Sequence, residues 1–335
     1  MLNPHNPAII LAPMQGLTDS PMRALQGEIG AFTFAVSEFV RISAEVLSKR
    51  PLYRHVPELR DRGLTSSGLP VQVQLLGGHP GRMAQSALVA CECGAKAIDI
   101  NFGCPAPTVN RHDGGATLLK YPRRIREIVK AVRDAVPPGI PVSAKLRLGW
   151  DSSDSIFENA EMAAEGGAAW LTIHGRTREQ RYDPPALWHP IRIVRERLGI
   201  PTVANGDIWS IEEFRRCYEE TGCTHYMLGR GALANPRLSH QIARELGLFA
   251  NGRVTTHDTG IDWPPYLRGL IRHMENAHGE STRHSVCRLK QWLNLARLYG
   301  SFTEFGLIKH ARSVDEIFAI LGEDRDEGRG TRDEG

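Results

Sequence analysis

Residues 201–231, PTVANGDIWSIEEFRRCYEETGCTHYMLGRG, contain two short apolar runs separated by a helix-length charged stretch. The runs PTVANGD (201–207) and HYMLGRG (225–231) have the length of buried strands. Parallel strands need a crossover of about a dozen residues, usually a helix, and the intervening stretch is long enough to supply one. The segment therefore predicts a strand–helix–strand unit. In it, Asn205-Gly206-Asp207 and Gly229-Arg230-Gly231 follow two neighbouring parallel strands.

The same alternation recurs upstream of this unit. Six more strand-like runs each precede a helix-length amphipathic stretch: AIILAPM (8–14), FTFAVSEF (32–39), VQVQLLG (71–77), AIDINFG (97–103), PVSAKLRL (141–148) and WLTIHGR (170–176). Residues 122–136 and 155–167 carry apolar side chains at i, i+3 and i+4, as amphipathic helices do. Eight such units predict an α/β fold, a (β/α)8 TIM barrel, over residues 1–240.

The remaining third of the chain is predicted to be helical. Helices are expected at 263–278, 284–300 and 313–321 within a separate domain at 241–322. The tail 323–335 is charged and rich in glycine, so we expect it to be disordered. Between Arg268 and Arg312 there are eight Lys or Arg and four His against three Asp or Glu. This basic excess fits either a solvated face or a surface for a polyanion.

Bulk properties exclude several classes of protein. The 335 residues are 41% hydrophobic and 24% charged, with a net charge of +3, which is ordinary for a soluble globular protein. No apolar run is long enough to span a membrane, and the first residues do not resemble a signal peptide, so a cytoplasmic location is expected. Six cysteines do not make a disulfide scaffold. Cys91 and Cys93 have no second pair that would complete a metal site.

Polar side chains gather at the carboxyl ends of the predicted strands, where barrel enzymes do their chemistry. These residues are Gln74, Asn101, Cys104, Lys145, Arg147, His174, Asn205 and Arg230. The glycines at 206, 229 and 231 allow backbone N–H groups to approach a phosphate, and Arg230 adds a permanent charge. Two ligands suit such a site: FMN, with Lys145 near the charge that develops on reduction, or a sugar phosphate, with Lys145 as a Schiff base.

Cys104 follows the fourth predicted strand, across the barrel mouth from the glycine loops at 205–207 and 229–231. It is flanked by Gly103 and Pro105 in the stretch DINFGCPAPTVNRHDGGA (99–116). Because no set of zinc ligands surrounds it in the sequence, a metal role is not expected. A nucleophile would need a low thiol pKa, whereas a general acid would need the thiol to stay protonated. Spacing alone leaves both roles open.

Seven motifs in order resemble those of the flavin-dependent tRNA-dihydrouridine synthases. They are APMQGLTDSPMR (12–23), VQLLG (73–77), NFGCP (101–105), KLRLG (145–149), HGRTREQRY (174–182), ANGDI (204–208) and LGRGAL (228–233). The resemblance covers about residues 8–320. Within this family, SEFVRIS (37–43) and CRLKQWL (287–293) are similar to the bacterial C branch, which acts on uridine 16 of the tRNA D-loop.

The resemblance implies an FMN-containing barrel followed by a tRNA-binding helical domain, with NADPH as reductant and no stable protein partner, so a monomer is expected. It assigns FMN binding to Pro13, Met14, Gln74, Lys145, His174, Asn205, Gly206, Asp207, Gly229 and Arg230. Cys104 would donate a proton to C5 of the uracil ring, while the flavin gives a hydride to C6. Positions near the base or the tRNA would be Arg41, Asn101, Arg147, Tyr182, Arg288, Lys290 and Arg312.

The chain departs from the family pattern in two loops. Pro107 stands where many relatives have a lysine, although Arg111 and His112 follow and could replace its charge. Arg181 occupies a position where glycine is common. Two other functions stay in view: an FMN barrel that reduces a free pyrimidine base, and a tRNA-binding barrel without turnover. The basic helical segment disfavours the first, and the retained Cys104 disfavours the second.

Overall fold

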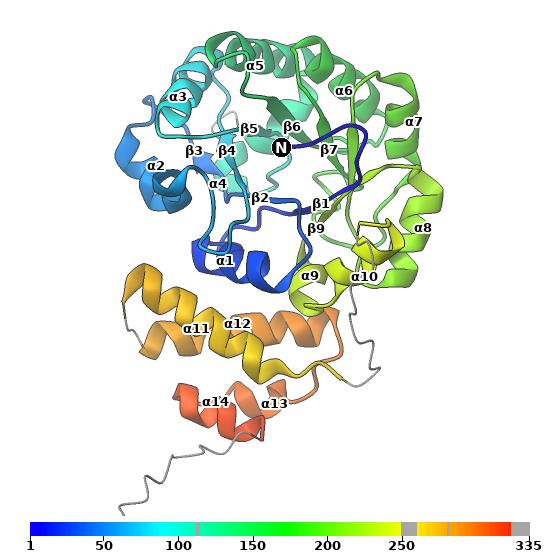
Figure 1. Cartoon of the computed structure of the whole chain (residues 1–335). Helices are drawn as coiled ribbons and strands as arrows, with labels where there is room; N and C mark the ends of the chain where they lie inside the picture. Colours follow the sequence, from blue (N-terminus) through cyan, green and yellow to red (C-terminus); the bar gives the residue numbers. More distant parts are fainter. Residues whose placement is uncertain (112–113, 249–259, 280–281, 323–335) are drawn as a thin grey trace, which may run out of the picture.

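Eight parallel strands close into a barrel in the computed structural model, which describes residues 1–111, 114–248, 260–279 and 282–322 (Figure 1). The ring consists of β1 (Ala8–Leu11), β2 (Phe34–Val36), β4 (Val71–Leu76), β5 (Ile98–Asn101), β6 (Val142–Arg147), β7 (Leu171–His174), β8 (Thr202–Asn205) and β9 (His225–Leu228). Pairing of β2 with both β1 and β4 completes the ring. The predicted (β/α)8 barrel is confirmed. One two-residue strand, β3 (Val40–Arg41), was not predicted and pairs with the end of β4.

In the unit at residues 201–231, local interactions set both ends of the helix. Ser210 caps helix α8 (Ile211–Thr221), because its hydroxyl accepts from the Glu213 N–H at 3.3 Å. The Glu213 carboxylate accepts from the Trp209 N–H at 2.9 Å and so also holds the backbone just before the cap. The helix ends at Gly222, whose φ of +60° is the left-handed conformation that glycine adopts without strain.

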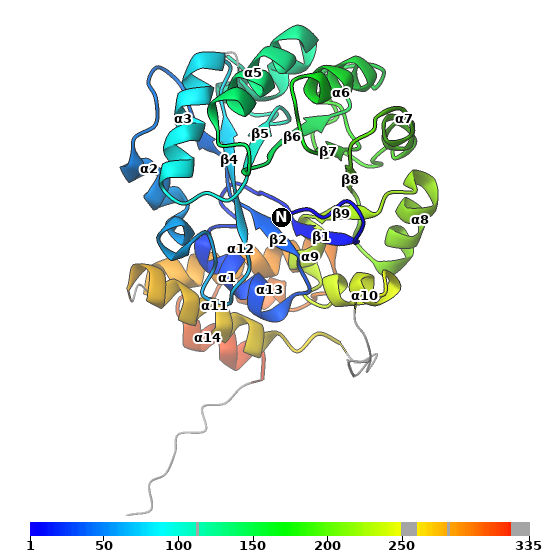
Figure 2. The ribbon, with the colours of Figure 1, turned by 45° about the horizontal axis from the view of Figure 1, so that its top comes forward.

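Helices surround the strands (Figure 2). They are α1 (Ser20–Ile29), α2 (Lys49–His55), α3 (Pro80–Glu92), α4 (Pro107–Asn110), α5 (Pro122–Ala135), α6 (Ser155–Glu165), α7 (His189–Arg197), α8, α9 (Arg230–Ala234) and α10 (Leu238–Glu245), with 3₁₀ turns at Pro57–Asp61 and Gly115–Lys120. Helix α5 buries one apolar stripe made of Ile125, Ile128, Val129 and Val132. Each side chain so buried contributes about 1.5–3 kcal/mol to folding.

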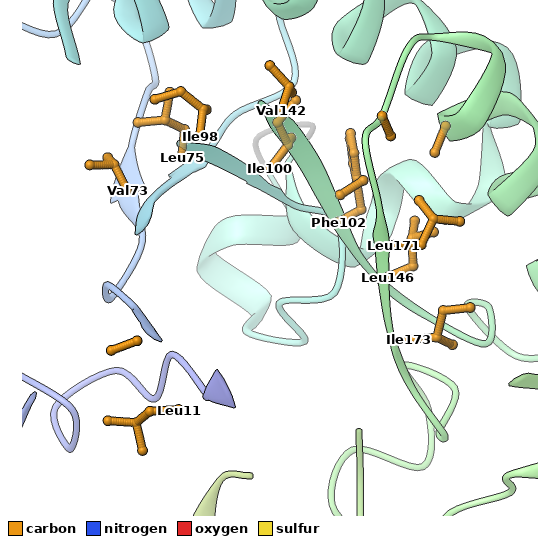
Figure 3. Close-up of a cluster of buried hydrophobic side chains, with 14 of the residues drawn as sticks. Leu11, Val73, Leu75, Ile98, Ile100, Phe102, Val142, Leu146, Leu171 and Ile173 are labelled. Atoms are coloured by element: carbon orange, nitrogen blue, oxygen red, sulfur yellow. The ribbon is translucent and has the colours of Figure 1, made fainter. Parts of the chain in front are cut away.

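Strand residues alternate between two environments. Apolar side chains such as Ile98 and Ile100 of β5 face the surrounding helices and join the main hydrophobic core, part of which Figure 3 shows. The intervening residues, such as Asp99 and Asn101, point into the barrel, where they hydrogen-bond to side chains of neighbouring strands. The register of the strands therefore decides which side chains reach the barrel interior and its mouth.

Four further helices pack against one side of the barrel: α11 (Trp263–His278), α12 (Thr282–Tyr299), α13 (Phe305–Ile308) and α14 (Val314–Ile320). Their apolar cluster includes Met22 of α1 and Leu233 of α9, so they share a core with the barrel. Helix α10 packs in the barrel core, and the predicted domain boundary between residues 240 and 241 falls within this helix. The predicted disordered tail at 323–335 lies outside the described residues, as does His112.

Candidate active site

A cavity of about 720 Å³ opens at the carboxyl ends of the barrel strands. Binding sites for cofactor-sized ligands usually span about 300–1,000 Å³, so the cavity can hold a flavin or a nucleotide. Its walls come from strand ends and loops on both sides of the barrel, and from the last residue of α12. Eleven residues singled out from the sequence line it together: Pro13, Met14, Asn101, Cys104, Lys145, Arg147, His174, Tyr182, Asn205, Gly229 and Arg230.

A smaller cavity of about 50 Å³, here called the glycine chamber, adjoins the main one. It is bordered by Gly206, Asp207, Trp209 and Gly231, and it shares His174, Asn205, Gly229 and Arg230 with the main cavity. Gly206 has a φ of +118°, and a Cβ there would lie 3.1 Å from the His174 ring. A glycine is therefore required at this point. Such a backbone-lined space beside an arginine suits a phosphate group.

Cys104 faces the main cavity from the loop after β5 and is half-buried. Burial raises the pKa of its thiol, although the Ala106 N–H and the guanidinium groups of Arg147 and Arg41 act in the opposite direction. The thiol is consequently protonated at neutral pH. Of the two roles that the sequence left open, the environment of Cys104 favours a proton donor over a nucleophilic thiolate.

The loop that carries Cys104 is supported by a buried chain of hydrogen bonds. Asn101 Oδ1 accepts from the Gly103 N–H at 2.8 Å, and Asn101 Nδ2 donates to Gln74 Oε1 at 2.8 Å. Gln74 Nε2 donates in turn to Asp99 Oδ2 at 2.7 Å, and Ser143 Oγ donates to Asp99 Oδ1 at 2.5 Å. Both polar atoms of the Gln74 amide are thus engaged below the cavity. The structure does not bring Gln74 to the cavity surface.

Arg147 joins the loops after β5 and β7. Its Nε donates to the Gly103 carbonyl at 2.8 Å, and its Nη1 donates to the carbonyls of Thr177 and Arg181 at 2.9 and 2.7 Å. Burial lowers the pKa of Arg147 to about 10, so the group stays charged at neutral pH. With three backbone partners, Arg147 fixes the position of the cysteine loop relative to the loop of Tyr182.

Lys145 and His174 come from the adjacent strands β6 and β7, in a register that pairs His174 with Arg147, and both side chains line the cavity. Burial lowers the pKa of Lys145 to about 8, and the nearby Arg147 charge adds to that effect. Lys145 Nζ donates to the neutral amide of Asn205 at 3.1 Å. Burial, with the surrounding cations, holds the pKa of His174 well below its usual range, so the ring is neutral. At neutral pH, Lys145 therefore contributes a positive charge to this part of the cavity, and the neutral His174 contributes none.

Asp207 was predicted to help bind the cofactor, but its carboxylate has another partner. Arg176 Nη2 lies 2.6 Å from both carboxylate oxygens, and the Ala186 N–H donates to Oδ2 at 2.7 Å. The ion pair is almost fully buried, with 1% and 10% of the two side chains exposed. The Asp207 side chain therefore ties the loop after β8 to Arg176 and to the backbone at Ala186.

The chain matches one family model over most of its length. The family model described as dihydrouridine synthase (Dus) matches residues 10–256. The chain belongs to the dihydrouridine synthase family. It is accordingly an enzyme, as the sequence predicted, and the resemblance inferred from the ordered motifs is confirmed.

Named relatives in the dihydrouridine synthase family match almost the whole chain. A tRNA-dihydrouridine(16) synthase of Neisseria meningitidis serogroup A is 42% identical over 315 residues, 93% of each chain. One from Pseudomonas putida is 43% identical over 318 residues, 94% of this chain and 96% of that protein. Among solved structures, a histamine dehydrogenase from a Rhizobium species has a TM-score of 0.57 at 14% identity and covers 73% of this chain and 47% of its own. This last likeness supports the barrel fold alone.

The basic residues that the family resemblance assigned to tRNA differ in their surroundings. Arg288 is 6% exposed; its guanidinium donates to the Gly16 carbonyl at 3.0 Å and to that of Leu17, so it joins α12 to the loop after β1. Lys290 Nζ donates to the carbonyls of Lys309, at 3.0 Å, and Ala311.

Arg41 and Arg312 are exposed. Arg41 donates to the Thr108 carbonyl at 3.2 Å near the cavity rim. Of these four basic residues, Arg41 and Arg312 have the solvent access that an RNA contact requires.

Glu38 and Tyr299 are among the cavity residues of this dihydrouridine synthase that were missed from the sequence. Glu38 is 8% exposed and accepts from the Gly16 N–H at 2.5 Å, while burial raises its pKa. Its signal was an acid at the end of the apolar run 32–39. Tyr299 reaches the cavity from α12, and nothing in its local sequence indicates this.

Two kinds of feature are absent from the described part of the chain. No group of three or more His, Cys, Asp or Glu residues is placed to hold a metal ion there. None of the helices described is long and apolar enough to cross a membrane.

Proposed function

We propose that this dihydrouridine synthase uses FMN and NADPH to reduce the C5=C6 bond of a uridine in the tRNA D-loop, at position 16. The observation that carries the proposal is that Cys104, whose thiol pKa is raised by burial, lines the main cavity together with Asn205, Gly229 and Arg230, which also border the glycine chamber. One reactant can therefore be held between an acid and an anchored cofactor. The relatives named tRNA-dihydrouridine(16) synthase support the choice of nucleotide.

The residues present suit FMN. Lys145 is a cation at the cavity floor, and within the described residues it makes no ion pair with a carboxylate. A buried cation of this kind is stabilised by an anionic ligand. Gly206, Gly229 and Arg230 border a space of the size and chemistry of a phosphate. We assign the phosphate end of FMN to this chamber and the flavin ring to the main cavity above Lys145.

The proposed reaction adds one hydride and one proton across a double bond. FMN held in this cavity, once reduced by NADPH, would supply hydride chemistry at C6 of the uracil ring. Cys104 gives its S–H proton to C5, and the resulting thiolate regains a proton from solvent. Asn101 and Arg147 keep the cysteine loop in place through Gly103, and the neutral His174 does not compete as an acid.

The substrate has to reach this cavity as an extruded nucleotide, because a stacked base exposes neither face to the acid. Tyr182 is 54% exposed at the cavity rim and offers a ring for stacking. Arg41 and Arg312 are the exposed cations that we assign to tRNA phosphates. Binding to phosphates releases counterions, so tRNA affinity should fall steeply with salt.

The test is to map dihydrouridine in tRNA from cells that lack this protein, and to repeat the reaction in vitro. We expect a yellow protein that NADPH bleaches, and a loss of dihydrouridine at position 16 alone. Loss at position 17 or 20 would contradict the assigned position. A colourless protein that binds no flavin would refute the mechanism. Reduction of free uracil or uridine at the same rate as tRNA would favour the alternative of a free-base reductase.

A further inference from the structure

The side chain of Arg230 lies among three aromatic rings from different parts of the chain. The centres of the Tyr182, Trp209 and Tyr299 rings lie 5.0, 4.7 and 4.5 Å from its guanidinium carbon. Trp209 and Tyr299 stack on each other, with ring centres 4.6 Å apart and planes within 7°. Aromatic faces attract a guanidinium, so this surrounding restricts the positions that Arg230 can adopt.

Tyr299 adds a directed contact to this arrangement. Its hydroxyl oxygen accepts from Arg230 Nη1 at 2.7 Å, which is the one hydrogen bond of the Arg230 side chain within the described residues. A guanidinium has five N–H donors, so most of them are left for a ligand. Arg230 borders both the main cavity and the glycine chamber, where those donors are available.

The backbone beside Tyr299 is held against the helix that begins at Arg230. A Cβ on Gly300 would lie 2.7 Å from the Ala234 carbonyl, so only glycine permits this approach of α12 to α9 (Figure 1). Trp292 Nε1 also donates to the Leu233 carbonyl at 2.8 Å. The ring of Tyr299 therefore has a fixed position relative to Arg230, although the two residues are 69 apart in sequence.

We infer that Tyr299 is a positioning residue for the cofactor site: it holds the Arg230 guanidinium toward the glycine chamber, so that the helical region takes part in binding the phosphate of FMN. The inference rests on the proposed function, since it requires a flavin phosphate in that chamber. An arginine held in place beforehand loses less side-chain entropy when it binds a phosphate than a free one does. The helical region would then serve the barrel chemistry directly, apart from any contact with RNA.

The test compares two flavins that differ in the phosphate alone. Full-length protein is loaded with FMN, or with riboflavin by exchange, and dissociation on dilution is followed by the fluorescence of free flavin. We expect Tyr299→Leu to weaken FMN binding about tenfold, and Tyr299→Phe, which keeps the ring, to weaken it about threefold. Riboflavin affinity should be unchanged in both variants. Leu298→Ala is the matched control, because Leu298 precedes Tyr299 in α12 and its side chain is 51% exposed.

A second comparison separates positioning from general damage. In protein that already carries Arg230→Gln, Tyr299→Leu should cause no further loss of FMN affinity, because its effect passes through the arginine. Equal weakening of FMN and riboflavin would overturn the inference and indicate a structural role. Unchanged FMN binding in Tyr299→Leu would overturn the inference about Tyr299 but would leave the proposed function standing. Absence of FMN binding in the unmodified protein would overturn both.

Discussion

The two halves of the barrel interior are built differently. On β4 to β7, the inward-facing residues are polar or charged and include Gln74, Asp99, Lys145 and His174. On β8, β9, β1 and β2, they are mainly apolar and form a cluster that includes Val203, Met227, Ile10 and Phe34. Asn205 and His225 are the polar residues at the inward positions of β8 and β9. Both halves have the same strand geometry and the same alternation. The difference therefore comes from side-chain choice at the inward positions.

This contrast separates two tasks. The polar half sets protonation states, because burial and neighbouring charges shift the pKa values of Cys104, Lys145 and His174. At the mouth of the apolar half, the loops after β8 and β9 place Gly206, Gly229 and Arg230 around the glycine chamber. Those loops are supported from outside by α12, through Arg288 and Tyr299. The groups with shifted pKa values thus lie inside the barrel, and the glycine chamber, to which we assign the flavin phosphate, lies at its junction with the helices.

The largest expected effect falls on the polar half. Cys104→Ala should lower the rate of dihydrouridine formation by about 10²- to 10⁴-fold, the usual contribution of a positioned general acid. FMN affinity should stay within about twofold, because the flavin phosphate is assigned to the other half. Single-turnover assays with tRNA, beside flavin titration, measure both. Cys287→Ala, at an exposed thiol, is the control. Loss of flavin together with activity would show that the two halves do not act separately.

The second effect concerns the apolar half and is one of stability. Asp207→Ala should lower the free energy of unfolding by about 3–5 kcal/mol, because it leaves the fully buried Arg176 guanidinium without its partner. Urea denaturation gives the value. The control is Asp134→Ala, which removes an ion pair to Lys130 whose side chains are 62% and 57% exposed and should cost less than about 1 kcal/mol. Similar costs for the two variants would contradict the structural role assigned to Asp207.

The eight barrel strands were predictable because each of them lies in a short apolar run of the sequence. The run 97–103 alternates apolar and polar residues and ends in a glycine, and seven similar runs fix the number of strands. The rule that barrel strands direct their carboxyl ends to one face predicted that Cys104 and Lys145 lie near each other, and both line the cavity. Local pattern carries this information because it depends on residues a few positions apart.

Interactions between distant segments were not predictable. Both polar atoms of the Gln74 amide are taken by residues of β5, a pairing that depends on strand register. Arg288 lies in a basic stretch, yet it faces the barrel, because charge counting does not say which side of a helix is covered. Tyr299 meets Arg230 across 69 residues. Each of these facts requires the tertiary packing of α12 or of neighbouring strands.

The pH dependence of flavin binding offers a smaller test of the polar half. Lys145 has a pKa lowered to about 8, so its charge is present below that pH and is lost as the pH rises above it. FMN affinity should be level below pH 8 and then fall, by at most about tenfold per pH unit, since one proton is linked to binding. Flavin titration from pH 6.5 to 9.5 checks this. Lys145→Gln should bind FMN more weakly at pH 7 and lack the decline above pH 8.

The smallest expected effect concerns the loop that Arg147 ties to the polar half. Arg181 has a φ of +49°, a left-handed conformation that favours glycine, and its carbonyl accepts from Arg147 at 2.7 Å. Arg181→Gly should relieve the strain and Arg181→Ala should keep it, so we expect the glycine variant to be more stable by about 1 kcal/mol. Urea denaturation of the two variants, both without the guanidinium, isolates the backbone contribution. If the alanine variant were as stable as the glycine variant, this loop would store no strain, and the hydrogen bond to Arg147 would suffice to hold it.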